Sequence, residues 1–340
     1  MLKERNHSID LLRFLAATMV VFFHFNEPIP YIDNFYRNLV KFGWLGVPIF
    51  FVISGYCILL TANASKNGFD FLLRRAFRIF PGYWLSLAII LTIVLLHLLL
   101  YKVNDITILP KSLYSIISTV ILNIDPISDV KGMSWVYWSL ACEVCFYMVV
   151  GFGLIFKRQY LQYYFMFVLS FSIIVTNIPK GIPWYFLKDW PCFALGISIF
   201  NFHTVVSTKD KAIAMIIFML SSIGIFIQNP INTTYNKHYI FVSFVTFFVI
   251  LLSTKFKIKA NFLSLMGDYS YAIYLLHIPI GIYLLGFLKK DLFVTNIYFC
   301  ISFDIVNYLI VFVFSILVFK YIEKPVINFG KSLSAKLFLY

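Results

Sequence analysis

The sequence predicts an all-α, polytopic membrane protein with about ten transmembrane helices around a central cavity or tunnel. Of its 340 residues, 61% are hydrophobic and only 13% are charged, and the mean hydropathy is +0.86. Soluble domains are roughly 45 to 50% apolar and about 25% charged. A soluble fold of this size could not bury so much apolar surface, so its main solvent is lipid. The composition excludes a secreted disulfide scaffold, a disordered chain and a soluble nucleotide-binding or barrel enzyme.

Each predicted span is an apolar stretch of about 17 to 25 residues, which as a helix crosses the hydrocarbon core. The spans lie near residues 9–26, 43–61, 83–101, 135–156, 161–178, 190–206, 212–228, 239–254, 268–288 and 297–319. The apolar stretch from Leu113 to Asn123 is too short to span, so we expect an interfacial or re-entrant element there. No second domain is apparent, and residues 1–340 are expected to form a single transmembrane domain.

The distribution of positive charge predicts the orientation of the chain. Segments on the side of the N-terminus carry the larger share of the 28 lysines and arginines. The main clusters are Arg74-Arg75-Arg78, Lys157-Arg158 and Lys255-Lys257-Lys259. Because cytoplasmic loops are enriched in Lys and Arg, both termini are predicted to be cytoplasmic. This bias explains the net charge of +13 better than nucleic-acid binding does.

The first predicted span contains Asp10, Arg13 and His24. Charged residues inside a bilayer usually face a protein interior or a cavity. At about 100° per residue, Arg13 and His24 share one helix face, and they lie roughly 16 Å apart along the axis. Only a long substrate or a tunnel would link them. The alternatives are a membrane-anchoring Arg13 paired with Asp10 and a structural, interfacial His24.

The fourth predicted span carries Ser139, Glu143 and Tyr147 at spacings of four, on one helix face. A carboxylate inside an apolar span needs a partner. Glu143 could orient and charge a histidine, as general acid–base chemistry requires, or pair structurally with an arginine. The C-x-x-C pattern around it lacks a second pair, so no metal site is predicted.

Three further groups of polar residues are candidates for support or binding. Ser270, Tyr274 and His277 share one face of the ninth predicted span, where packing and chemistry are equally compatible with the pattern. Arg75 and Arg78, on a short helix between the second and third spans, could hold phosphate or simply anchor the chain. Glu323 follows the last span and is expected to pair with one of these arginines.

These segments, in this order, resemble the acyltransferase-3 family of bacterial inner-membrane acyltransferases. The first hallmark is an arginine that is followed, after ten intervening residues, by a histidine. It occurs here in SIDLLRFLAATMVVFFH. The others that follow are GWLGVPIFFVISGYCI, RRAFRIFPGYW, WSLACEVCFY, GDYSYAIYLLHIP and YIEKP. Many members carry an aspartate after GWLGV, where this chain has Pro48, so no acidic role is assigned there. Some members add an SGNH-type esterase domain; here all activity is expected from the membrane unit.

The resemblance implies transfer of an acyl group, most often acetyl, from cytoplasmic acyl-CoA to a hydroxyl of a surface or envelope glycan. His24 would act as general base or transient acyl carrier, with Glu143 as its carboxylate. Arg13, Arg75 and Arg78 would bind the donor phosphates. The donor is a substrate, and no permanently bound cofactor is expected.

The alternative function is a transporter or flippase for a lipid-linked saccharide, because intramembrane charges also mark transport routes. Against it, the two halves show no matched pair of helices broken by glycine or proline. There is also no Walker-type phosphate-binding sequence. The ordered motifs therefore favour the acyltransferase.

Overall fold

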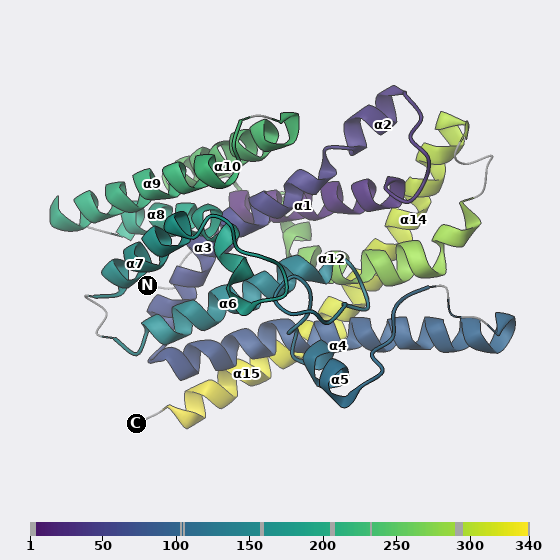
Figure 1. The fold of residues 1–340 in the computed structure, drawn as a ribbon, viewed down its shortest axis with the longest axis horizontal. Helices are drawn as coiled ribbons and strands as arrows, with labels where there is room; N and C mark the ends of the chain where they lie inside the picture. The colour runs from purple at the N-terminus through teal and green to yellow at the C-terminus, as the bar shows by residue number, and fades with distance from the viewer. Residues whose placement is uncertain are drawn as a thin grey trace.

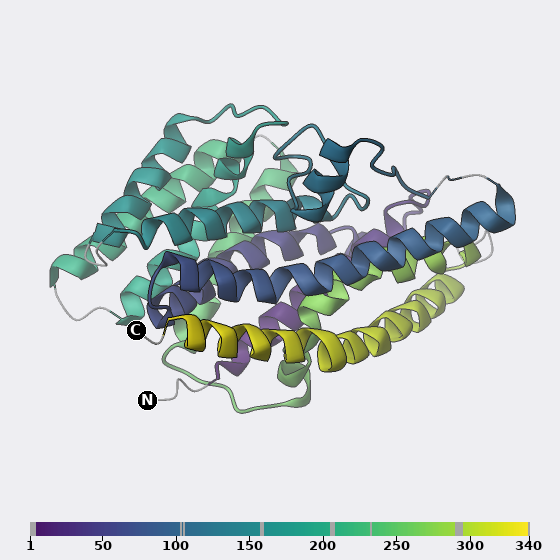
Figure 2. The same ribbon diagram turned by 90° about the horizontal axis from the view of Figure 1, so that it is seen from below.

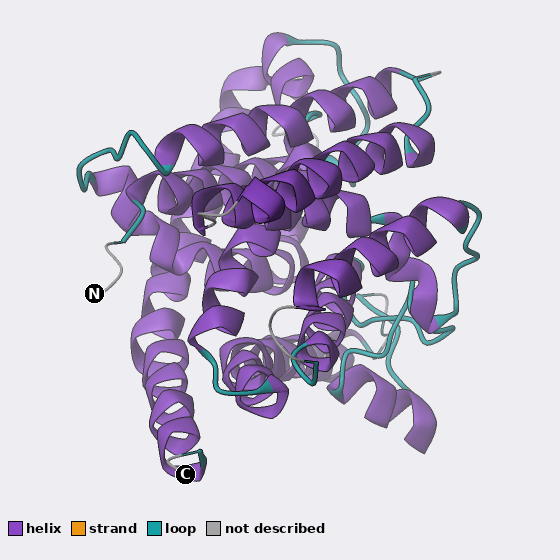
Figure 3. Cartoon of the chain, turned by 90° about the vertical axis from the view of Figure 1, so that its left-hand side faces the viewer, coloured by secondary structure: helices purple, strands orange, loops and turns teal. Residues whose placement is uncertain are grey.

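The structure is a computed structural model that describes residues 5–102, 104, 106–156, 160–204, 208–231, 233–289 and 295–338. Within these ranges the chain forms helices and loops and no strand (Figure 3). The all-α prediction is confirmed. The cluster Lys157-Arg158 used for the orientation lies outside the described residues.

The first half of the chain contains α1 (His7–Asn26), α2 (Phe35–Val40), η1 (Gly43–Leu45), α3 (Gly46–Ala64), α4 (Gly68–Tyr101), α5 (Leu113–Val120), α6 (Tyr137–Gly153) and α7 (Leu161–Ile174). The second half contains η3 (Pro183–Lys188), α8 (Trp190–Thr204), α9 (Thr208–Gln228), α10 (Thr234–Ser253), α11 (Phe262–Leu265), η4 (Met266–Tyr269), α12 (Ser270–Leu276), η5 (His277–Leu284), η6 (Gly286–Leu288), α14 (Ile297–Val318), η7 (Phe319–Glu323) and α15 (Lys324–Leu337).

Six helical segments in the described part are long and apolar enough to cross a bilayer, so the protein is a multi-pass membrane protein. The predicted count of about ten is not confirmed. The other predicted spans correspond to shorter helices, such as α6 and α7, or to the divided segment of η4, α12 and η5. The eight residues of α5 are too few to span, as the short apolar stretch predicted.

Two helices run further than the sequence predicted. Arg75 and Arg78 do not lie on a separate short helix, because α4 continues without a break for 34 residues through Pro81. Likewise α14, η7 and α15 form one continuous helical segment, Ile297–Leu337. The α15 part lies alongside the start of α4 (Figures 1 and 2), and Phe77 on α4 packs against Gly330 on α15. This pairing brings Glu323 next to the arginines of α4.

Helix α1 lies in the middle of the bundle, in contact with α3, α10, η4, α11, α12 and α14. Asn6 caps its N-terminus, and the Asn6 side chain accepts hydrogen bonds from the backbone N–H groups of Ser8 and Ile9. A Cβ atom on Gly43 would lie 2.0 Å from the Met19 carbonyl oxygen, and one on Gly46 would lie 2.5 Å from that of Ala16. The glycines of the GWLG motif therefore allow the start of α3 to lie directly against α1.

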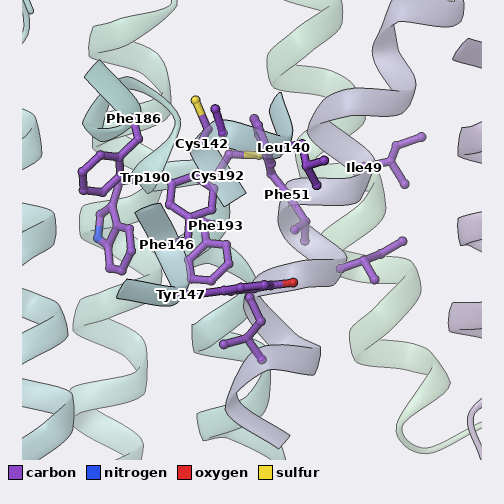
Figure 4. Packing of buried hydrophobic residues seen from close by; sticks show 14 of the residues in the cluster. Ile49, Phe51, Leu140, Cys142, Phe146, Tyr147, Phe186, Trp190, Cys192 and Phe193 are labelled. Atoms are coloured by element: carbon purple, nitrogen blue, oxygen red, sulfur yellow. The ribbon is translucent and has the colours of Figure 1, made fainter. Parts of the chain in front are cut away.

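Part of the main hydrophobic core lies between α3, α6 and α8. The rings of Phe146, Trp190 and Phe193 meet at centroid distances of 4.4 to 5.7 Å. Tyr147 lies at the edge of this cluster and points its hydroxyl away from the phenyl rings (Figure 4). The core thus fixes one wall from which Tyr147 reaches a polar interior. Helix α1 begins and α15 ends at the same end of the molecule (Figures 1 and 2).

Candidate active site

A polar cavity of about 850 Å³, including its open mouth, lies between α1, α3, α4, α6 and α12. We call it the Arg13 cavity. Its polar lining residues are Arg13, Ser54, Arg75, Arg78, Ser139, Glu143, Tyr147, Ser270, Tyr271 and Tyr274. Among the described lining residues, three guanidinium groups therefore face one carboxylate. Such a site favours an anionic ligand, because the lining carries more guanidinium groups than carboxylates, and the further carboxylates near Arg13 and Arg78 lie 3.8 Å away.

Arg13 lines this cavity and also a second one of about 800 Å³, whose lining includes Arg5, Asp10, His203 and Lys257. Its guanidinium lies 3.8 Å from Asp10, the pairing that the sequence offered as an alternative role. However, Asp10 is held more closely by Arg5, at 2.5 Å. Arg13 therefore lines two cavities of the bundle while keeping a longer contact with Asp10.

Arg75 and Arg78 both reach the cavity, as their spacing on one helix face suggested. Arg75 bonds to the Thr61 hydroxyl, and its guanidinium lies 5.3 Å from the Tyr147 ring centre. Arg78 lies 3.8 Å from the carboxylate of Glu323, so the expected pairing with Glu323 is confirmed. Neither oxygen of Glu323 has a hydrogen-bond partner in the described part, and the residue is only 2% exposed.

Glu143 is not the carboxylate partner of His24, which corrects the sequence-based pairing. Its Oε1 accepts hydrogen bonds from the hydroxyls of Ser54 and Tyr147, both at 2.8 Å. The reason is position along α1: Glu143 shares a cavity with Arg13, whereas His24 lies three turns further on and is not a lining residue. Ser54, which the sequence analysis did not single out, completes this contact.

His24 pairs with Glu27, three residues later, through a 2.8 Å hydrogen bond from its Nδ1. The sequence analysis missed Glu27, although a carboxylate one helical turn after a histidine is a readable signal. The bond from His24 lowers the pKa of Glu27, which lies beyond the end of α1, against the opposing effect of partial burial. The His24 side chain is only 13% exposed and lies edge-on to Trp135, so it does not face lipid.

Two side chains link the Arg13 cavity to His24. Tyr274 lines the cavity, and its hydroxyl bonds to Ser139 at 2.8 Å and to the Val136 carbonyl. The ring of His277 lies 5.7 Å from that of Tyr274 and 5.4 Å from that of His24, with which it stacks at 30°. Packed rings, not open space, therefore separate the cavity from His24, so the tunnel that the sequence led us to expect between Arg13 and His24 is not open in the described residues.

A second polar cluster, which the sequence analysis missed, lies near the other end of α1. We call it the Asp304 network. Asp304 accepts hydrogen bonds from Lys289 and Tyr36, both at 2.6 Å, and from Asn26 at 2.8 Å. Asp304 is fully buried and the Lys289 side chain is 4% exposed. An aspartate in the last predicted span was the available signal, because it needs a buried partner.

The sequence is similar to those of known acyltransferases. An acyltransferase-domain family profile matches residues 6–322. The chain is 26% identical over 302 residues to an O-acetyl transferase of Shigella phage Sf6, covering 82% of this chain and 85% of that protein. It is 22% identical over 299 residues to a putative acetyltransferase of Acidianus two-tailed virus, covering 82% and 84% of the two chains.

A third relative is longer. The chain is 24% identical over 369 aligned positions to the O-acetyltransferase OatA of Staphylococcus aureus strain NCTC 8325, covering 94% of this chain and 56% of that protein. No solved structure matches the chain. Because the family profile covers nearly all of the sequence, the protein belongs to the acyltransferase-3 family of membrane acyltransferases.

Proposed function

We propose that this protein transfers an acyl group, most often acetyl, from acyl-CoA to a hydroxyl of a cell-surface or envelope glycan. The observation that supports it best is the Arg13 cavity, where three guanidinium groups gather and which the packed rings of Tyr274 and His277 separate from His24. A CoA thioester is phosphorylated at one end and reactive at the other. The relatives named as O-acetyltransferases support an oxygen acceptor.

In this proposal the donor enters from the cytoplasm through the second cavity, where Arg5 and Lys257 lie close to Arg13. Arg13, Arg75 and Arg78 hold its phosphate groups by charge-assisted hydrogen bonds. The pantetheine arm then extends towards His24, over the roughly 16 Å that separates Arg13 from His24 along α1. Side-chain movement at Tyr274 or His277 must open the last part of this path.

His24 acts as the base. Glu27 accepts from its Nδ1, and a carboxylate can only accept, so in neutral His24 the Nε2 carries the free lone pair. That nitrogen takes the proton from the glycan hydroxyl as the oxygen attacks the thioester carbonyl. In the alternative route, Nε2 itself attacks, becomes acylated and passes the group to the hydroxyl. Glu143 belongs to the donor end, where Ser54 and Tyr147 fix its carboxylate.

The orientation completes the proposal: a bacterial inner membrane, with both termini in the cytoplasm. Because α1 begins near Arg13 and ends beside His24, the arginines then lie towards the cytoplasmic donor and the histidine towards the external acceptor. Fluorescent tags or cysteine labelling at the two termini test this directly. Labelling from outside intact cells at either terminus would contradict it.

The test of function is acetyl-CoA-dependent acetylation of the host glycan in membranes that contain wild-type, His24→Ala or Arg13→Ala protein at equal levels. Loss of glycan acetylation is expected in both variants, with His97→Ala as a matched control for a histidine elsewhere in the membrane. Wild-type activity in either variant would remove that residue's assigned role. Radiolabel found on the protein before the acceptor is added would favour the covalent route.

A further inference from the structure

His277 holds the least satisfied nitrogen near the proposed reaction centre. The residue is completely buried. Its Nδ1 lies 2.6 Å from the Tyr274 carbonyl oxygen, whereas its Nε2 has no hydrogen-bond partner in the described part of the chain. A buried polar atom without a partner costs free energy, so a histidine kept in this state calls for an explanation.

The hydrogen bonds define the tautomers of both histidines. A carbonyl only accepts, so Nδ1 of His277 carries the proton and Nε2 carries the lone pair. The same argument assigns the lone pair of neutral His24 to its Nε2, because Glu27 holds Nδ1. Two stacked imidazoles 5.4 Å apart thus each present a basic nitrogen and no second proton. Packing alone would be served as well by a phenyl ring, which has no polar atom to leave unpaired.

The backbone around His277 is also unusual. The π-helical segment η5 begins at His277 and contains Pro279. Proline has no N–H, so the carbonyl of Leu275, four residues earlier, lacks its usual helical donor and instead accepts from Ser86 at 2.9 Å. π-Helical turns often occur at functional sites, where they redirect a side chain. Here the turn places the His277 ring between Tyr274 and His24.

We propose that His277 is a second proton-transfer residue, which takes the proton from His24 and delivers it to the sulfur of the donor. This rests on the proposed function. His24 Nε2 accepts the proton of the glycan hydroxyl while the oxygen forms its bond to the thioester carbon. The carbon–sulfur bond then breaks, and sulfur leaves with the electron pair. Side-chain rotation must first bring Nε2 of His24 within hydrogen-bond distance of Nε2 of His277. The proton then passes from His24 to His277 and on to sulfur, giving the free thiol and the acyl ester.

The positions of the two rings fit this direction of transfer. His24 lies beside Glu27, whose side chain is 46% exposed, while His277 is buried next to Tyr274, a lining residue of the Arg13 cavity. The proton begins on the acceptor and ends on the donor's sulfur, so it must move from the His24 side towards the cavity. In the described part of the chain, His277 is in ring contact with both His24 and Tyr274, and its Nε2 is a free acceptor nitrogen.

The experiment compares wild type, His277→Gln and His277→Asn, with His97→Gln as the matched control, in membranes at equal protein levels. Both His277 amides can still donate to the Tyr274 carbonyl, but neither can carry a proton. We expect kcat with acetyl-CoA to fall about 100-fold with little change in the KM of either substrate, as for loss of an acid–base group. His97→Gln should retain wild-type kcat.

The pH dependence of kcat distinguishes a proton-transfer role of His277 from a purely structural one. Two interacting imidazoles take part in proton transfer in the wild type, whereas only His24 does so in the His277 amide variants. The pH profile of kcat in these variants should therefore lose one ionisation step. In His277→Ala membranes, added imidazole should raise kcat at least tenfold. A kcat of either amide variant within threefold of wild type, or a loss of kcat with an unchanged pH profile, would overturn the role. A wild type without acetyl transfer would instead refute the proposed function itself.

Discussion

The Arg13 cavity and the Asp304 network are both built from charged groups inside the bundle, yet they differ in how those charges are paired. In the network, both oxygens of Asp304 accept hydrogen bonds, and Lys289 also donates to the Phe25 carbonyl. Around the cavity, Arg75 Nε and both oxygens of Glu323 have no hydrogen-bond partner in the described residues. Moreover, Arg13 lies 3.8 Å from its nearest carboxylate.

This difference separates structure from function. The Asp304 network also borders a cavity, but its charges are paired with each other, so we expect it to tie α1, α2 and α14 together. An incompletely paired cluster beside a cavity has free charge and room for a substrate. Changes in the network should therefore alter stability, and changes around the cavity should alter activity.

The largest expected effect is on stability, in the Asp304 network. Asp304→Ala leaves the ammonium of Lys289 buried without its carboxylate, which should destabilise the fold by about 3 to 5 kcal/mol. Thermal unfolding of the detergent-solubilised protein measures this. The double variant Asp304→Leu with Lys289→Met removes both charges and should recover much of the loss. Equal stability of wild type and Asp304→Ala would show that the two clusters do not differ in this way.

The converse effect is expected for Arg13→Gln. Asp10 keeps its partner Arg5, which lies 2.5 Å away, so the free energy of unfolding should change by less than about 1 kcal/mol. The donor loses a charge-assisted hydrogen bond of about 1.5 to 3 kcal/mol, so its KM should rise about 10- to 100-fold. Kinetics with varied acetyl-CoA, beside thermal unfolding, separate the two effects. If Arg13→Gln lowered the stability and left the KM for acetyl-CoA unchanged, Arg13 would have a structural role and not a binding role.

A smaller effect is expected for Glu27→Gln. The amide oxygen can still accept from His24 Nδ1, but the negative charge that stabilises a protonated His24 is lost, so kcat should fall about tenfold. Because the pKa of Glu27 is lowered in the folded protein, its ionised pairing stabilises the fold above its ordinary pKa of 4.5. The stability difference from wild type should therefore be full at neutral pH and vanish as the pH falls below that value. A difference that grows on acidification would contradict the pairing.

The smallest effect is expected for Ser54→Ala. Glu143 loses one of its two hydroxyl donors and keeps Tyr147, and the lost hydrogen bond is worth about 1 kcal/mol. We expect a change in the KM for acetyl-CoA of about two- to fivefold, with the KM for the glycan unchanged. Tyr147→Phe is the matched variant for the other donor. A change in the KM for the glycan alone would assign Glu143 to the acceptor side of the site.

Much of the site was readable from residue spacing. The 11-residue separation of Arg13 and His24 placed both on one face of a helix, and both indeed face the protein interior. Ser139, Glu143 and Tyr147 were placed on one face and all line the cavity. The prediction that Glu143 pairs with His24 was wrong. Helix periodicity gives the direction of a side chain but not the depth of its neighbours on other helices.

The sequence by itself determined that this chain is helical and lies in a membrane, because composition alone requires lipid around so much apolar surface. It also singled out Arg13, Glu143 and His24 as candidates, since charge inside a span is costly, although it passed over Asp304 and Glu27. Only the tertiary structure decided how they pair: Glu27 with His24, His277 against His24, and Asp304 with Lys289. The physical reason is that most of these contacts join helices distant in the chain, and their relative depth is set by packing, which no local pattern records.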